Sequence, residues 1–185
     1  MKRVVEESLV LKEIPVEGYE KVVVINDERS GLKAIICVHN STLGPTLGGI
    51  RIYPYPTFEA ALTDVKRLAR GMTYKSAMSE TGLGGAKSVI ICNPKHKTKE
   101  MLAAFAEAIN RFEGLYTGAE DSGCSVADVN FMAIILPMLS VFPTKKAAAI
   151  PLLSLRGEPS GEFKPFYRHW MDRPLWKAKL SLSKV

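Results

Sequence analysis

The amino-acid sequence predicts an α/β fold with a mixed, largely parallel sheet flanked by helices. Two observations lead to this class. From residue 50 onward, short β-branched runs alternate with segments whose apolar residues recur at helical spacing, as in chains that join parallel strands through helices. Before that point two β-branched runs follow one another directly, and such a hairpin makes the sheet mixed.

The first predicted elements are a hairpin and a loop. The runs at 21–26 (KVVVIN) and 32–39 (LKAIICVH) flank a turn in which Gly31 can take the left-handed conformation that such loops need. Three glycines and a proline at 40–49 (NSTLGPTLGG) indicate a loop that approaches another group closely. A short strand at 50–55 follows and ends at prolines.

Helices and strands alternate from there onward. Thr57 can cap a helix at 58–71, where the apolar residues share one face and Gly71 can end it. Residues 72–78 then form a second short helix or an extended turn. The remaining predicted elements are a strand at 87–92, a helix at 101–114, a short strand at 115–118, a loop at 120–125 and a helix from 126.

The composition changes at residue 134. Residues 1–133 hold 16 Lys and Arg against 16 Asp and Glu, whereas 134–185 hold 9 against 3 and so carry the whole net charge of +6. The same segment contains 6 of the 11 prolines and only 2 of the 14 glycines, and it shows no sustained period. We therefore divide the chain into a folded domain at 1–133 and a basic, proline-rich tail at 134–185.

Nothing in the sequence indicates a membrane span or a secretory signal. No run approaches the ~18 consecutive apolar residues of a span, and acidic residues interrupt the N-terminal segment. The three cysteines, Cys37, Cys92 and Cys124, form no CxxC pair, and we expect Cys37 and Cys92 to be buried. A cytoplasmic protein with reduced thiols is the expectation.

Residues 81–88 (TGLGGAKS) combine three glycines with a lysine, and three interpretations compete. A Walker A loop requires GxxxxGK[ST], but Ala86 precedes Lys87 here and Thr81 replaces the first glycine. A dinucleotide loop follows a strand and opens a helix, whereas this stretch leads into a strand. Both phosphate-binding interpretations fail, and a lysine at the start of a buried strand remains.

Lys87 is then either a strand-end lysine that extends to solvent or a group with chemistry of its own. Lys75 lies in an apolar segment twelve residues earlier, and Asp121 lies in a loop after a later strand. Loops at strand ends converge on one cleft in an α/β sheet, so these three groups can meet. Burial and a neighbouring cation lower a lysine pKa, so one lysine can hold a carboxylate, the other can act as base, and Asp121 can pass protons.

Three ordered stretches carry a family resemblance. Residues 42–51 (TLGPTLGGIR), 67–90 (RLARGMTYKSAMSETGLGGAKSVI) and 117–124 (TGAEDSGC) resemble the N-terminal, substrate-binding domain of the Glu/Leu/Phe/Val dehydrogenases, most closely the leucine type. The likeness covers about 18–133. It implies NAD-dependent oxidative deamination of an L-amino acid to a 2-oxo acid and ammonia, in a homo-oligomer.

The resemblance also implies roles for individual residues. Lys87 would activate the water that attacks the imino intermediate, Lys75 would bind the substrate α-carboxylate, and Asp121 would exchange protons with the amino nitrogen. Gly48, Gly49 and Met72 match positions that line the substrate site.

Leu47 bears on specificity. Glutamate dehydrogenases of this family have a lysine there to hold the side-chain carboxylate, whereas an apolar residue leaves that carboxylate desolvated and unpaired. We therefore expect an apolar substrate, namely leucine, valine, isoleucine or phenylalanine, with the aliphatic ones favoured.

The sequence departs from the family in two ways. Ser122 and Cys124 stand where leucine dehydrogenases commonly have Val and Thr. After Ala133 the family continues into a Rossmann domain that binds NAD, whereas 134–185 contains no GxGxxG between a strand and a helix. We interpret 134–185 as the product of a frameshift or truncation and expect the NAD domain to be absent from this chain.

Two other functions remain open. The domain could be a non-catalytic fragment that assembles with itself or with full-length subunits. The basic tail could bind nucleic acid, which is the weaker interpretation because a shifted frame produces such charge by accident.

We predict that the purified chain shows no NAD-dependent oxidation of L-leucine above a mock purification. Hydride transfer needs the nicotinamide held against the substrate Cα, and loss of that positioning costs several orders of magnitude in rate. Turnover that co-purifies with the chain and disappears in Lys87→Met would overturn this prediction.

Overall fold

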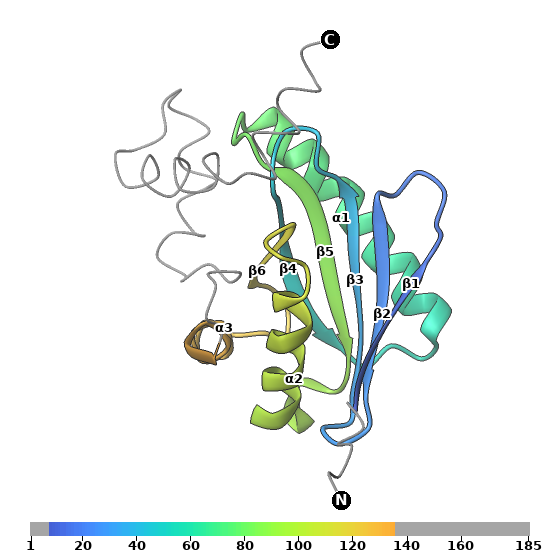
Figure 1. Cartoon of the computed structure of the whole chain (residues 1–185), viewed down its shortest axis with the longest axis vertical. Helices are drawn as coiled ribbons and strands as arrows, with labels where there is room; N and C mark the ends of the chain where they lie inside the picture. The colour runs from blue at the N-terminus through green and yellow to red at the C-terminus, as the bar shows by residue number, and fades with distance from the viewer. Residues whose placement is uncertain (1–7, 136–185) are drawn as a thin grey trace, which may run out of the picture.

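The computed structural model describes residues 8–135. Its elements are β1 (Leu9–Ile14), β2 (Lys21–Asp27), β3 (Leu32–Asn40), β4 (Thr46–Tyr53), α1 (Phe58–Met78), β5 (Gly84–Ile91), a 3₁₀ turn (Pro94–His96), α2 (Lys99–Asn110), β6 (Tyr116–Glu120) and α3 (Val126–Ile135), as Figure 1 shows. Nearly all of the predicted tail at 134–185 lies outside the described residues, so the boundary at 134 stays a prediction. No helix within 8–135 is long and apolar enough to cross a membrane.

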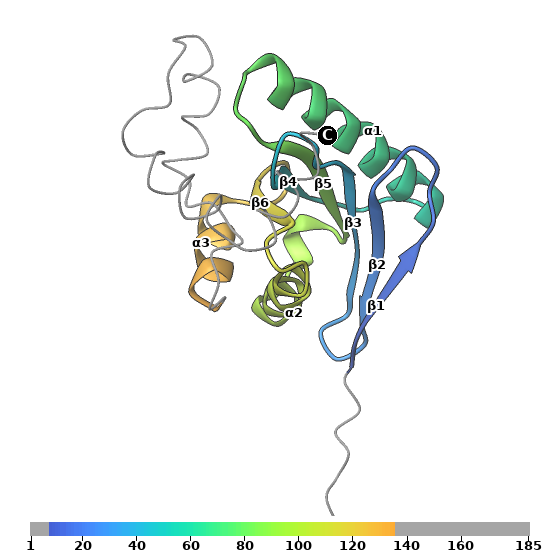
Figure 2. The ribbon, with the colours of Figure 1, turned by 45° about the horizontal axis from the view of Figure 1, so that its top comes forward.

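The strands form one sheet in the order β1-β2-β3-β5-β4-β6. Helix α1 lies on one face, and α2 and α3 lie on the other (Figures 1 and 2). The predicted mixed sheet flanked by helices is confirmed.

The expectation that this sheet is largely parallel is wrong. Three pairs, β1 with β2, β2 with β3 and β3 with β5, are antiparallel. Parallel pairing is confined to β4, which pairs with β5 and with β6. The reason is that β3, the second strand of the hairpin, lies beside β5 and runs antiparallel to it. Strand β1 adds a further antiparallel pair because it lies beside β2.

Strand β1 has no counterpart in the sequence prediction. Leu9 and Leu11 pack against the core on the α2 side, whereas Val10 between them is 55% exposed. This alternation has the two-residue period of a strand, but Lys12 and Glu13 interrupt its apolar pattern. Pairing with β2, which sets Leu11 opposite Ile25, is what makes the segment a strand.

Helix α1 continues through Gly71, where the sequence predicted an end. The helix begins after Thr57, whose hydroxyl oxygen accepts a hydrogen bond from the Ala60 amide, and runs for 21 residues. Packing on β3 and β5 outweighs the ~1 kcal/mol that a glycine costs inside a helix. Met72 and Lys75 therefore belong to the same rigid element as the N-cap.

Side chains alternate along β5 and divide between two cores. Val89 packs with Ala61, Val65 and Ala69 of α1 in the core on one face of the sheet. Ile90 belongs to the larger core under α2 and α3. Because the alternation has a period of two, residues 85 and 87 share the α1 face with Val89.

Helix α1 approaches β5 closely at Gly85. A Cβ atom at Gly85 would lie 2.1 Å from both the backbone nitrogen and Oγ1 of Thr73. A Cβ at neighbouring Gly84 would lie 2.3 Å from the Asn40 carbonyl oxygen. These glycines of the 81–88 stretch thus make room for protein backbone.

We predict opposite effects for alanine at two glycines. Gly85→Ala forces α1 away from β5, and overpacking of this kind lowers the free energy of unfolding by about 1–3 kcal/mol. Gly71→Ala meets no atom within 4 Å and adds a better helix former, so it raises that free energy by about 0.5–1 kcal/mol. Urea unfolding followed by far-UV circular dichroism measures both. Equal effects of the two substitutions would contradict the packing at Gly85.

Candidate active site

Lys87 lies within the sheet on the α1 face and is only 6% exposed. It is the fourth residue of β5, well inside the strand whose start the sequence placed at Lys87. Period-two alternation along β4 brings Gly49 and Arg51 to the same face, and Asp121 follows directly after β6. Helix α1 packs mainly on β3 and β5, so this group lies beside the helix, over β4 and β6.

The structure brings Lys87 and Asp121 into direct contact. Nζ of Lys87 lies 2.8 Å from Oδ2 of Asp121. A Cβ atom at Gly49 would lie 2.6 Å from that Nζ and 2.8 Å from Cβ of Asp121. A side chain at residue 49 would therefore displace the pair from this position.

Gly48, one residue earlier, faces the other side of the sheet and allows β4 and β5 to approach. A Cβ there would lie 1.9 Å from the carbonyl oxygen of Ala86. The Gly48 carbonyl accepts a hydrogen bond of 3.1 Å from the Tyr116 hydroxyl, which lies 2.8 Å from Oγ of Ser88. Tyr116 and Ser88 are fully buried, so these hydroxyls fix the glycine pair from behind.

The loop after β6 is hydrogen-bonded onto β4 and so positions Asp121. The Ile52 amide donates to the Ser122 carbonyl at 2.9 Å, and the Cys124 amide donates to the Asp121 carbonyl at 2.9 Å. Gly123 has φ +80°, and a Cβ there would lie 2.2 Å from the Ile52 carbonyl oxygen. Only glycine fits this turn without strain.

A capping box anchors the far end of the same loop. The Ser125 amide donates to Oδ2 of Asp128 at 2.7 Å, while the Asp128 amide donates to Oγ of Ser125 at 3.3 Å. Lys97 binds Oδ2 of Asp128 and also donates to the Gly123 carbonyl at 3.0 Å. Asp121 is thus held by a loop with fixed ends.

Arg51 is a site residue that the sequence analysis did not single out. Its Nε lies 3.0 Å from Oδ2 of Asp121, and its Nη1 lies 3.0 Å from Oδ2 of Asp64 on α1. The Tyr55 hydroxyl donates to the same Asp64 oxygen at 2.6 Å, and Arg67 binds Oδ1 at 3.0 Å. The available signal was its place at the end of the 42–51 stretch (TLGPTLGGIR), two residues after Gly49.

These contacts shift the pKa values of the pair. Burial lowers the pKa of Lys87 most strongly, Asp121 opposes that effect, and the Arg51 charge adds to it. Burial alone would raise the pKa of Asp121, but the hydrogen bond and charge of Lys87, the Ser122 amide and Arg51 together lower it. The carboxylate is therefore ionised and the amine loses its proton more readily than a free lysine.

The other predicted site residues lie on β4 and α1. Leu47 is buried on the same face of β4 as Gly49, and Met72 is half-buried in α1. Lys75 is exposed in the last turn of α1, and within 8–135 no hydrogen bond or ion pair joins it to Lys87 or Asp121. The cation that acts on Lys87 is Arg51, whereas the sequence suggested Lys75.

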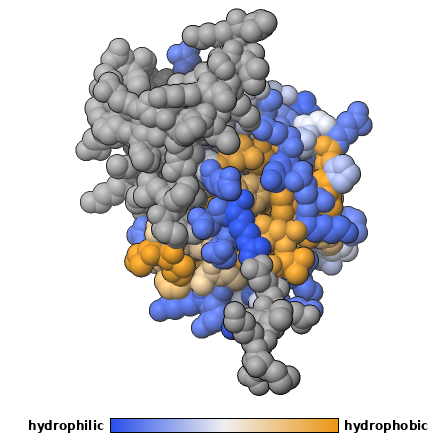
Figure 3. Space-filling view, in the orientation of Figure 1, coloured by the Kyte–Doolittle hydropathy of each residue, from blue (hydrophilic) through white to orange (hydrophobic). Residues whose placement is uncertain are grey.

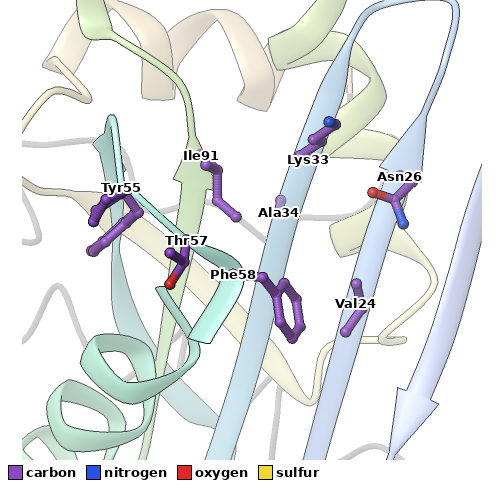
Figure 4. Close-up of a pocket in the computed structure, with 9 residues that line it drawn as sticks. Val24, Asn26, Lys33, Ala34, Tyr55, Thr57, Phe58 and Ile91 are labelled. Atoms are coloured by element: carbon purple, nitrogen blue, oxygen red, sulfur yellow. The ribbon is translucent and has the colours of Figure 1, made fainter. Parts of the chain in front are cut away.

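A cavity of about 230 Å³ lies elsewhere, between the sheet and the segment that leads into α1 (Figure 4). Its lining includes Val24, Lys33, Tyr55, Phe58 and Ile91. Tyr55 links this cavity to the ion pairs, because its hydroxyl donates to Asp64. Within the described residues, no three potential metal ligands gather at one point.

The three cysteines are free within the described chain. Cys37 and Cys124 are buried, and burial raises the pKa of each to about 12, so both are unreactive thiols. Cys92 is half-buried, which corrects the expectation of a buried residue: it follows the last residue of β5, where the sheet ends.

Comparisons with known proteins show which family the described domain resembles. A family model described as "Glu/Leu/Phe/Val dehydrogenase, dimerisation domain" matches residues 19–136. Leucine dehydrogenase of Bacillus subtilis is 51% identical over 115 residues, which are 62% of this chain and 32% of that enzyme. Valine dehydrogenase of Streptomyces virginiae is 47% identical over 117 residues, 63% of this chain and 33% of that enzyme.

One solved structure is similar to this chain in both fold and sequence. The crystal structure of L-tryptophan dehydrogenase from Nostoc punctiforme superposes with a TM-score of 0.64 and 39% identity, over 67% of this chain and 37% of that chain. This chain spans about a third of the length of the curated relatives named above.

We predict that Asp121→Asn destabilises the protein more near neutral pH than in alkaline solution. The substitution leaves the Lys87 ammonium buried beside Arg51, at a cost of about 2–3 kcal/mol, below that of a fully buried pair because the Asp121 side chain is 23% exposed. As the pH rises, folded Lys87 loses its proton before an unfolded lysine does at about 10.4. The unfolded state then binds more protons, so stability rises with pH.

Urea unfolding at a series of pH values measures this slope. The double variant Lys87→Met/Asp121→Asn is the control, because it has no buried ammonium and should lose the additional slope. The same slope in both variants would show that Lys87 is not its source.

Proposed function

This chain belongs to the Glu/Leu/Phe/Val dehydrogenase family, and we propose that it forms the substrate-binding part of an amino-acid dehydrogenase that oxidatively deaminates a branched-chain L-amino acid, with leucine the first candidate. The observation that carries the proposal is the buried contact of Lys87 with Asp121 beside Gly49. Such a pair supplies a base and a proton carrier a few ångströms apart.

Lys87 serves as the general base. With its pKa lowered by burial and by Arg51, it accepts a proton from the water that adds to the imino carbon of the substrate. Asp121 starts as a carboxylate, so it can accept a proton from the amino nitrogen and return it later. Gly49 leaves room for the pair itself, since a Cβ atom there would lie 2.6 Å from Nζ.

Lys75 binds the substrate α-carboxylate, and apolar groups receive the side chain. Support for the first role is that Lys75 lies eleven residues after Asp64, about three turns along α1, and so on the same helix face as the carboxylate that binds Arg51. Support for the second is that Leu47 lies on the same strand face as Gly49, while Met72 lies on the adjacent turn of α1. Gly48 allows the strand beneath the substrate to approach β5.

The cofactor implied by the family is NAD, but residues 8–135 do not fit it. Their glycine-rich stretch at 81–88 enters β5 and not a helix, and Gly84 and Gly85 face protein backbone. The redox step therefore lies outside these residues, whose part is to bind the substrate and move its protons. A cytoplasmic location stays a prediction.

A second candidate is an assembling fragment without catalysis, and we propose a homo-oligomer in either case. The matched family model is described as a dimerisation domain. Val126, Ile134 and Ile135 of α3 are 46%, 85% and 42% exposed, and α3 forms a hydrophobic patch at the left of Figure 3. Light scattering distinguishes a defined oligomer from a monomer.

We predict that the chain binds the 2-oxo acid of leucine more tightly than 2-oxoglutarate, and that Leu47→Lys reverses this order. A lysine at 47 pairs with the second carboxylate and removes an apolar contact, which changes the affinity ratio by about tenfold or more. Isothermal titration calorimetry measures both ligands. Leu47→Met, which keeps an apolar residue of similar size, is the control and should retain the original order. Equal binding of both acids by the unsubstituted chain would count against the proposal.

A further inference from the structure

We propose that Arg51 is a positioning residue of this site: its guanidinium holds the Asp121 carboxylate against Lys87 and supplies the cation that favours release of the lysine proton. The inference rests on the proposed function, since it concerns the same base. Arg51 lies in β4, not in β5 with Lys87, and its hydrogen bonds go to Asp121 and Asp64, not to the Lys87 amine.

The geometry points to Arg51 because it is fixed at two points. Nε and Lys87 Nζ share one acceptor, Oδ2 of Asp121, at 3.0 and 2.8 Å. Nη1 binds Asp64 at 3.0 Å. The planar guanidinium thus ties β4, the loop after β6 and α1 together, and a planar fork with two anchors defines the carboxylate position better than a flexible ammonium does.

Asp64 is itself oriented by other groups. Its Oδ2 accepts from the Tyr55 hydroxyl at 2.6 Å as well as from Arg51, and its Oδ1 accepts from Arg67 at 3.0 Å. Arg67 is 76% exposed and makes no contact with Asp121 among the described ion pairs. Two arginines therefore bind the same carboxylate, and one of them reaches the Lys87 pair.

The charges around Lys87 assign a direction to this effect. Asp121 faces it from the loop after β6, Arg51 from β4 and Asp64 from α1, and Tyr55 lies beyond Asp64. From β3 the Cys37 thiol pairs opposite Lys87, and burial raises its pKa to about 12, so it adds no charge near neutral pH. Arg51 disfavours the ammonium form and competes with Lys87 for Oδ2, whereas both carboxylates favour that form. Removal of Arg51 therefore strengthens the hold of Lys87 on its proton through both effects.

A purely structural role of Arg51 predicts a different experimental result from a positioning role. The Arg51, Asp121 and Asp64 side chains are 25%, 23% and 18% exposed, so water screens their ion pairs in part. A structural role predicts lower stability with an unchanged Lys87 titration. A positioning role predicts that the titration itself moves.

The test is the pH titration of Lys87 in the full chain. Lysine labelled with ¹³C at the ε carbon reports its protonation by NMR, and Lys87→Arg assigns the resonance. In Arg51→Met the midpoint should rise by about one pH unit, which lowers the neutral fraction about tenfold at any pH well below it. Arg51→Lys restores the charge and should shift the midpoint less than half as far.

Two variants at Asp64 and its other partner, Arg67, complete the experiment. Arg67→Met, the matched control, should leave the midpoint in place, because Arg67 binds Asp64 without reaching Asp121. Asp64→Asn removes the charge that neutralises Arg51, so it should move the midpoint to lower pH, opposite to Arg51→Met. An unchanged midpoint in folded Arg51→Met, or an equal shift in Arg67→Met, overturns the proposal.

Folding is checked in the same samples with a thiol reagent. Cys37 and Cys124 are buried and should react only if the domain opens. If Arg51→Met exposes them, the opposite-signed shift of Asp64→Asn decides the question. Addition of the 2-oxo acid of leucine separates the two proposals: no binding with an intact Arg51 shift refutes the proposed function alone, and binding without that shift refutes the role of Arg51 alone.

Discussion

The absence of side chains at the centre of β4 is the constraint on which the site and half of the sheet depend. Among the strands of residues 8–135, β4 is the one with parallel neighbours on both sides, β5 and β6. At Gly48 a single carbon would lie 1.9 Å from the backbone of β5, and at Gly49 it would lie 2.6 Å from the Lys87 amine. The β5 backbone at Gly48 cannot yield to such an overlap, and at Gly49 the ion pair would have to move, so strand spacing and ion-pair position depend on these two residues.

At these two glycines polar groups lie on both faces of the sheet, within an otherwise apolar core. On one side the Tyr116 hydroxyl binds the Gly48 carbonyl and meets Ser88. On the other side Lys87 and Asp121 meet over Gly49. A buried amine is tolerated only with a carboxylate beside it, and the rigid loop after β6 keeps that carboxylate there. The ion pair of Lys87 and Asp121 therefore lies beside a close contact between the backbones of β4 and β5.

Much of this could be predicted from local pattern, and the failures have physical causes. The hairpin, the strands around 50–55 and 87–92 and the helix that begins after Thr57 follow from period and capping, which are local. Gly71 does not end α1, because packing on β3 and β5 outweighs a glycine's preference. β1 was missed since its strand form depends on pairing with β2. Arg51 was missed since its two partners, Asp121 and Asp64, come from separate elements far from it in the sequence.

The sequence by itself determined the class of fold, the family and the residues able to do acid–base chemistry, because apolar period, glycine placement and ordered motifs are written along the chain. Only the tertiary structure decided strand direction, the meeting of Lys87 with Asp121 and the use of Arg51 as the neighbouring cation in place of Lys75. These depend on register and distance between segments as much as 70 residues apart, as between Arg51 and Asp121. Electrostatic coupling falls steeply with distance and exposure, and neither quantity is contained in the order of the residues.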